Sequence, residues 1–248
     1  MHSKPTRGLR DIAPAQLIDA LDVLPAHAIR RHRIFRRLRL RAAAREKRMG
    51  RSISCAAGCG ACCCQLVPLS VPEIAFLVKT LDGAEEGPQI RSRFEMLNRD
   101  LDTRGMLDRF RGLNTSREDV NVPRDYFFQG IACPLLRNQS CSIHSIRPVA
   151  CREYSVTSPP AWCADPFSNS IARVKIHRKM TSALAKTAAH LLDIPAALVP
   201  MPMLFAFHDD NRELLSRTWG GIELFETMLT FALGREIGSE KENAPDAS

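Results

Sequence analysis

The sequence predicts a mainly α-helical fold with irregular loops. Several segments repeat apolar residues at helical spacing, strand signals are weak throughout, and a Pro-, Ser- and Arg-rich stretch from Cys133 to Cys163 has no sustained period. The chain has 248 residues, of which 45% are hydrophobic. A chain of this length and composition is expected to bury a substantial core.

The N-terminal region is expected to contain two helices, over 11–24 and 26–48, separated by Pro25. Between Arg30 and Arg48 there are ten Lys or Arg residues and one acid, a net +9 in a chain whose total is +8. Two interpretations of the basic helix 26–48 stay open. It binds an anionic partner (nucleic acid, acidic protein or anionic lipid), or it is a solvated arm that covers the domain.

The middle of the chain has clear helix signals. Ser70 and Glu73 have capping-box spacing and Pro72 suits a first turn, which predicts a helix over 71–81. Apolar periodicity predicts a second helix over 88–102. A short helical continuation is expected at 106–110, and residues 114–129 are expected to be mostly loop.

The C-terminal third is also expected to be helical. A long amphipathic helix is predicted from Val174 to Leu191, and further helices over 213–218 and 221–233. The run that begins at Ile194 is apolar but interrupted by prolines, so buried irregular structure is expected there. The polar tail 237–248 is expected to be disordered.

The expected compartment is the cytoplasm. No stretch reaches the roughly 18 apolar residues of a membrane-spanning helix, and the first residues lack the apolar core of an export signal. In a reducing cytoplasm disulfides do not persist, and clustered cysteines bind metal or perform redox chemistry.

The cysteines are the strongest functional signal. CAAGCGACCC, which starts at Cys55, holds five cysteines in ten residues, and four more follow between Cys133 and Cys163. Two such groups brought together could supply two four-ligand sites with one thiol left over. Cysteine is also a common buried small residue, but that role does not account for five in ten residues beside glycines.

Two blocks carry a resemblance to a known family. The first is CGACC from Cys59, followed by VPEIAFL; the second contains CPLL, CSIH and RPVACREY. The chain resembles the CxxCxxCC-type, YkgJ-like cysteine-cluster family of zinc- or iron-chelating proteins, over about residues 55–163. With the spacing, the resemblance implies these metal ligands: Cys55, Cys59, Cys62, Cys63, Cys133, Cys141, Cys151 and Cys163.

Three details of the cysteine region stay open. Cys55 lies one residue further from Cys59 than the family pattern has it, and Cys64 is unassigned. His144 stands where Tyr is commoner, so it is either a packing or hydrogen-bonding residue or a ligand beside Cys141. All-thiolate ligation suits zinc and iron alike, with an iron–sulfur cluster slightly favoured by the number of cysteines.

Three arginines in the second cysteine segment are also expected to act on the thiols. Arg137, Arg147 and Arg152 are expected to lie around this group, where a cation would favour thiolates. Arg147 could instead pair with local carbonyls or with Glu153.

The expected organisation is a single metal-stapled α-helical domain with a basic N-terminal helix and a C-terminal helical extension. Its parts are N-terminal helices at 1–50, a cysteine-cluster metal-binding domain at 51–165, C-terminal helices packed on it at 166–236, and the tail at 237–248.

Three functions are compatible with the sequence. The first is a cytoplasmic protein with an iron–sulfur or zinc centre. The second is a metal-dependent redox enzyme, or an S-adenosylmethionine-using protein-lysine methylase-like enzyme, which the resemblance implies because some members carry that label. The third is a partner- or nucleic-acid-binding protein with structural zinc. The sequence identifies no catalytic residue and no nucleotide-binding glycine loop, so whether the chain is an enzyme stays open.

Overall fold

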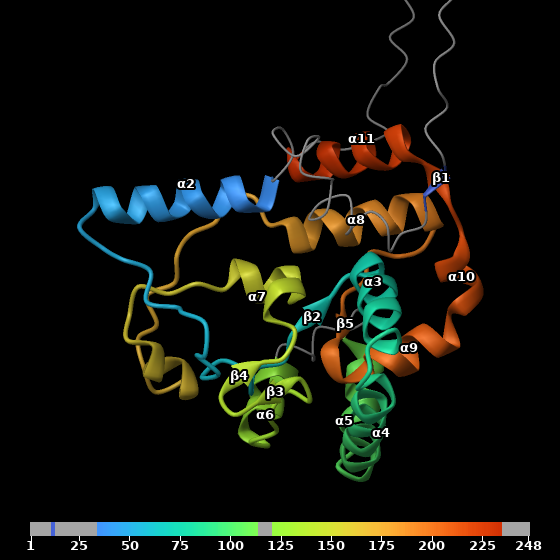
Figure 1. Ribbon diagram of the computed structural model, residues 1–248, viewed down its shortest axis with the longest axis horizontal. Coiled ribbons are helices and arrows are strands. Elements are labelled where there is room, and N and C mark those ends of the chain that lie inside the picture. Colours follow the sequence, from blue (N-terminus) through green and yellow to red (C-terminus); the bar gives the residue numbers. More distant parts are fainter. Residues whose placement is uncertain (1–10, 13–33, 114–120, 235–248) are drawn as a thin grey trace, which may run out of the picture.

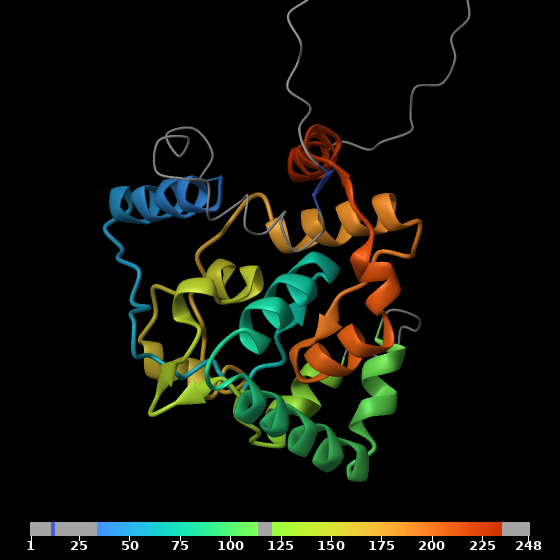
Figure 2. The same cartoon turned by 45° about the vertical axis from the view of Figure 1, so that its right-hand side comes forward.

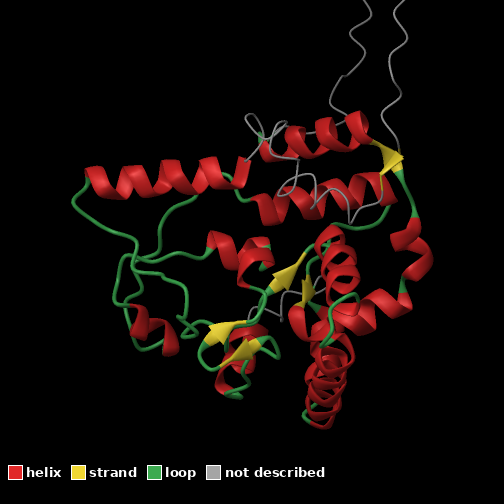
Figure 3. Cartoon of the chain, in the orientation of Figure 1, coloured by secondary structure: helices red, strands yellow, loops and turns green. Residues whose placement is uncertain are grey.

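The computed structural model describes residues 11–12, 34–113 and 121–234, and this part of the chain is mainly helical, as predicted (Figures 1 and 3). The helices are α2 (Ile34–Arg48), α3 (Val71–Asp82), α4 (Gly87–Thr103), α5 (Met106–Gly112), α6 (Val122–Phe128), α7 (Val149–Glu153), α8 (Met180–Leu192), α9 (Leu204–Asp210), α10 (Arg212–Ser216) and α11 (Gly221–Ala232). Short 3-10 turns occur at η2 (His144–Ile146), η3 (Pro160–Ala164) and η4 (Met201–Met203). Among the described helices, none is both long and apolar enough to cross a membrane.

The strands are short and form antiparallel pairs, two of which join distant parts of the chain. The pairs are β1 (Asp11–Ile12) with β6 (Trp219–Gly220), β2 (Pro68–Leu69) with β5 (Val199–Pro200), and β3 (Leu136–Arg137) with β4 (Ser140–Cys141). The first two pairs join residues far apart in sequence, whereas the third is a local hairpin. The weak strand signals of the sequence agree with this limited pairing.

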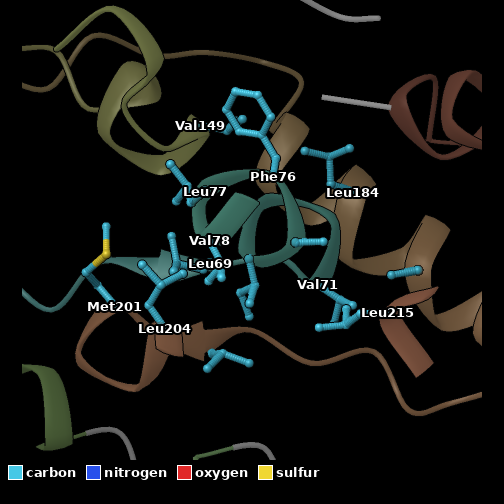
Figure 4. Packing of buried hydrophobic residues seen from close by; sticks show 14 of the residues in the cluster. Leu69, Val71, Phe76, Leu77, Val78, Val149, Leu184, Met201, Leu204 and Leu215 are labelled. Atoms are coloured by element: carbon cyan, nitrogen blue, oxygen red, sulfur yellow. The ribbon is translucent and has the colours of Figure 1, made fainter. Parts of the chain in front are cut away.

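The main core surrounds α3. Most residues of α3 are buried, and Figure 4 shows Val71 and Leu77 on different sides of the helix, each against other elements. Leu184 of α8 and Leu204 of α9 belong to the same core, as does Met228 of α11. Figure 2 shows α8 lying between α3 and α11. The C-terminal helices therefore share one hydrophobic core with the middle of the chain.

A second, smaller core supports the cysteine segments. It is formed around Phe110 of α5 and Tyr126 of α6, whose rings lie 5.8 Å apart. Leu66, just after Cys64, and Ile131, just before Cys133, pack against it. The two cysteine segments are thus anchored to the same small hydrophobic core.

Most predicted helices are confirmed, but three expectations for the middle and C-terminal parts of the chain are wrong in part. The loop expected over 114–129 contains α6, because Pro123 suits a first turn and Tyr126 is buried in the second core. The helix expected from Val174 starts at Met180, because the backbone at 173–174 pairs instead with residues 155–156. The proline-containing run from Ile194 contains β5, η4 and α9.

The N-terminal expectations are tested only where the chain is described. Residues 11–12 form a strand rather than the start of a helix, because their backbone pairs with β6. The basic helix is present from Ile34 to Arg48. Residues 13–33, which include the rest of both predicted helices, and the tail 237–248 lie outside the described residues.

One buried carboxylate joins α3 to α7. Glu73 is 2% exposed and accepts hydrogen bonds from the Ser70 backbone N–H (2.9 Å), the Ser70 hydroxyl (2.6 Å) and the Val149 N–H (2.6 Å). The Ser70 contact is the predicted capping box, whereas the Val149 contact crosses to the first turn of α7. Burial raises the pKa of the Glu73 carboxyl, although the hydrogen bonds from Ser70 and Val149 oppose the shift.

We expect Glu73→Ala to lower the free energy of unfolding by about 3 kcal/mol, because two buried backbone N–H groups lose their acceptor. Urea unfolding followed by circular dichroism measures the loss. Glu85→Ala removes an exposed carboxylate from the turn after α3 and serves as the matched control. A Glu73→Ala protein as stable as this control would contradict the assigned role.

The raised pKa also predicts a pH dependence. The protonated form of Glu73 favours the folded state, so its contribution is complete below the unfolded-state pKa and is lost as the pH rises through the folded-state pKa. In Glu73→Gln this loss should vanish, which unfolding curves measured across that pH range would reveal.

Candidate metal centre

The first cysteine segment is a series of turns. Gly58 has a φ of 83°, the left-handed region that glycine adopts without strain. The Cys63 N–H then bonds the Gly60 carbonyl at 2.9 Å, and the Gln65 N–H bonds the Cys62 carbonyl at 3.1 Å. The tight turning places Cys59, Cys62 and Cys63 within one compact loop.

The second segment presents its cysteines on four different local structures. Cys133 precedes the β3–β4 hairpin, Cys141 ends it, Cys151 lies in α7, and Cys163 lies in η3. The hairpin turn has positive φ at Asn138 (47°) and at Gln139 (62°), the combination of a two-residue type I′ turn. Short elements joined by prolines thus set the spacing of these four thiols.

Backbone contacts join the two segments directly. The Cys133 N–H donates to the Cys63 carbonyl at 2.8 Å, and the Ser54 N–H donates to the Val156 carbonyl at 3.0 Å. The Val156 N–H in turn points to the Cys55 sulfur at 3.4 Å. Figure 1 shows the chain after α2 running beside the chain that leads to η3.

Gly60 allows a close approach between the two segments. A Cβ at this position would lie 2.8 Å from the Leu136 side chain and 3.0 Å from the Gln139 carbonyl oxygen. No other residue type leaves this space empty, so the hairpin that carries Cys141 can rest on the first segment only beside a glycine.

The buried thiols of Cys133 and Cys151 are both influenced by the cysteines around them. The pKa of Cys133 is raised to about 11, first by burial and then by its neighbours Cys141, Cys64 and Cys62. The pKa of Cys151 is also raised, first by burial and then by Cys133, Cys62 and Cys141. Such effects require proximity, so Cys62, Cys133, Cys141 and Cys151 lie near one another and are called here group A.

A second neighbourhood shares one member with the first. Cys163 is 4% exposed. Burial is the largest cause that raises the pKa of its thiol, and Cys62, Cys55 and Cys59 raise it as well. Cys55, Cys59, Cys62 and Cys163 are called group B. Cys62, whose pKa is raised first by its contact with Cys63, therefore lies between the two groups.

Cys64 also lies close to this region, because it raises the pKa of Cys133. The sequence left Cys64 unassigned, and adjacency to Cys63 carried no information about the direction of its side chain. Of the nine cysteines, all are thus placed in or beside the two groups.

The three arginines play different roles. Arg147 lowers the pKa of both Cys62 and Cys151 against the larger raising effects, as expected for a cation near thiols. Arg152 instead donates to the Arg147 carbonyl at 2.7 Å. Arg137 pairs with Glu86 at 3.0 Å.

His144 takes the hydrogen-bonding role that was one of its two expected roles. Its Nε2 lies 3.1 Å from the Arg147 guanidinium, which can only donate, so this nitrogen is the acceptor. Glu153, an alternative partner for Arg147, bonds the first turn of α8 instead.

The donor chemistry of the two groups fits a thiophilic metal. Groups A and B, together with Cys63, contain eight of the nine cysteines, all as free thiols. Thiolates suit both zinc and iron–sulfur centres. Within the described residues, however, no group of three or more His, Cys, Asp or Glu side chains stands in a geometry that could hold a metal ion. The groups are gathered, but their sulfurs do not converge on one point.

The comparison with protein families agrees with the cysteine pattern. Residues 54–169 match the model of the CxxCxxCC family, described as a "Putative zinc- or iron-chelating domain". The matched segment, residues 54–169, is called here the CxxCxxCC domain. The CxxCxxCC domain holds all nine cysteines and includes Glu73, but it covers somewhat less than half of the chain. No curated protein and no solved structure matches the chain.

We expect Gly60→Ala to push the β3–β4 hairpin away from the first segment, because the added Cβ meets a backbone carbonyl. The melting temperature should fall, and the metal bound per chain should fall with it. Gly220→Ala is the control, since a Cβ at that position meets nothing within 4 Å. Equal behaviour of the two variants would show that close approach at Gly60 is dispensable.

Proposed function

We propose that the CxxCxxCC domain binds a metal centre in the cytoplasm, and that this centre is an iron–sulfur cluster in preference to zinc. The proposed ligands are Cys55, Cys59, Cys62, Cys63, Cys133, Cys141, Cys151 and Cys163. The preference for iron and sulfide rests on the number of thiols, which exceeds what one tetrahedral zinc ion needs.

The observation that carries the proposal is the meeting of both cysteine segments in groups A and B. Group A combines Cys62 from the first segment with Cys133, Cys141 and Cys151 from the second. Group B likewise combines Cys55 and Cys59 with Cys163. Each group takes donors from both segments, as a split metal site requires.

Electrostatics supports a bound cation. Neighbouring cysteines raise the pKa of Cys133 and of Cys151, because thiolates placed together repel one another in a buried setting. A metal offsets this repulsion and converts gathered thiols into ligands. It also holds the Pro-rich segment 133–163, which has little regular structure of its own.

The metal prediction is tested by anaerobic purification of the full chain. We expect visible absorbance together with iron and acid-labile sulfide in stoichiometric amounts. A colourless protein that carries zinc would overturn the preference for an iron–sulfur cluster. A protein that holds neither metal, even after anaerobic reconstitution, would overturn the proposed function.

The ligand assignment is tested in the same assay. Cys133→Ser and Cys151→Ser should lose metal, because each removes a donor from group A. Cys64→Ser is the matched control, since Cys64 lies beside Cys133 but is not a proposed ligand. Loss of metal in Cys64→Ser alone would contradict the assignment.

A second candidate function is binding of an anionic partner by the basic helix. Ala42 and Glu46 face the protein and are buried, whereas Arg41, Lys47 and Arg48 of the same helix are exposed. We infer that this exposed face of α2 contacts nucleic acid or another polyanion.

We expect the Arg41→Glu, Lys47→Glu double variant to lose salt-sensitive binding of a short fluorescent oligonucleotide, measured by anisotropy. Lys79→Glu, Lys186→Glu makes the same charge change at exposed positions of α3 and α8 and should bind like the parent. Equal loss in both variants would mean that net charge, and not α2, determines binding.

A further inference from the structure

A groove of about 560 Å³ lies outside groups A and B, between α7, the start of α8 and residues 173–177. Figure 1 shows the chain between η3 and α8 passing beneath α2 at this place. None of the nine cysteines lines the groove. The lining residues that bear on its chemistry are Tyr154, Arg173, Lys175, Ile176, Lys179 and Leu198.

The groove is rich in cations. Arg173, Lys175, His177 and Lys179 occupy every second position of one stretch, and all four are exposed. In the part of the chain that the structure describes, no ion pair is made by Arg173 or Lys175. Unpaired cations gathered along one wall attract an anion.

The single carboxylate of the lining is already engaged. Glu153 accepts hydrogen bonds from the Met180 N–H (2.5 Å), the Thr181 N–H (3.4 Å) and the Thr181 hydroxyl (2.8 Å). It caps α8, and Lys179 lies close enough to lower its pKa against the effect of burial. Glu153 therefore already occupies the start of α8, and it does not neutralise Arg173 and Lys175, which line the groove.

Contacts from neighbouring elements hold this cationic wall in position. The Arg173 guanidinium lies over the Tyr154 ring, 5.1 Å from its centroid, which leaves the N–H edge of its fork available. Arg45 of α2 donates to the Lys175 carbonyl (2.7 Å) and lies 2.6 Å from His177 Nε2. Because Arg45 can only donate, Nε2 accepts, and the ring proton of His177 lies on Nδ1 as a further donor.

The rest of the lining is apolar, which limits the kind of anion. Ile176, Leu198, Pro68 and the buried Val174 provide walls that an inorganic ion would leave unused. The volume falls within the range of pockets that hold small organic ligands, roughly 300–1,000 Å³. Several cationic donors along one wall suit the several oxygens of a phosphate better than a single carboxylate.

We propose that this groove binds a small organic phosphate of nucleotide size. Its phosphate groups contact Arg173, Lys175 and Lys179, and its apolar or aromatic body lies against Ile176 and Leu198. The site is separate from the metal centre, so each of the two proposals can fail without the other.

Calorimetric titration of the full-length protein at low salt, with ATP as the probe, tests the proposal. We expect saturable ATP binding, weaker binding of inorganic pyrophosphate, and about a tenfold loss of ATP affinity in both Lys175→Glu and Arg173→Ala. Lys186→Glu, which changes an exposed charge on α8 outside the groove, should bind ATP like the parent.

Several results would overturn the proposal. These are absence of ATP binding by the parent, equal loss in Lys175→Glu and Lys186→Glu, and pyrophosphate binding as tightly as ATP. Binding of a short oligonucleotide that ATP does not displace would assign the groove to a polymer instead. Metal content and melting temperature are measured on every variant, so that a failure of the metal centre or of folding is recognised separately.

Discussion

The buried carboxylate of Glu73 is the interaction on which the cysteine region depends most. A carboxylate is costly to bury, and three donors from Ser70 and Val149 make its position tolerable. Through them α3, the centre of the core, fixes the start of α7. Glu153 at the end of α7 then bonds the first turn of α8. The short helix that carries Cys151 is therefore held at both ends by carboxylates rather than by its own length.

The cysteine loops obtain their order from contacts with other elements. They contain few regular hydrogen bonds, so the apolar anchors Leu66 and Ile131 and the close approach at Gly60 define how the two segments meet. Cys62 takes part in both groups. A substitution at Cys62 therefore alters both groups, whereas a substitution at Cys141 alters group A directly.

Local signals in the sequence were sufficient to predict most helices and to single out the cysteines as candidate ligands. The capping box at Ser70 and the periodicity of 88–102 are local, and both gave the correct element. α6 was missed because its aromatic run has no helical period, and its stability comes from the burial of Tyr126. The second role of Glu73, as acceptor for Val149, and the assignment of thiols to two groups depend on contacts over long sequence distances, which no local pattern contains.

The shared core around α3 has a consequence for how the CxxCxxCC domain can exist. Residues 54–169 supply α3 but not Leu184, Leu204 or Met228, which cover it. Cut out at those limits, the segment would expose a large apolar face and would be prone to aggregate. The CxxCxxCC domain and the C-terminal helices thus depend on one shared core, so proteolytic loss of the last helices would destabilise the cysteine loops without removing a single cysteine.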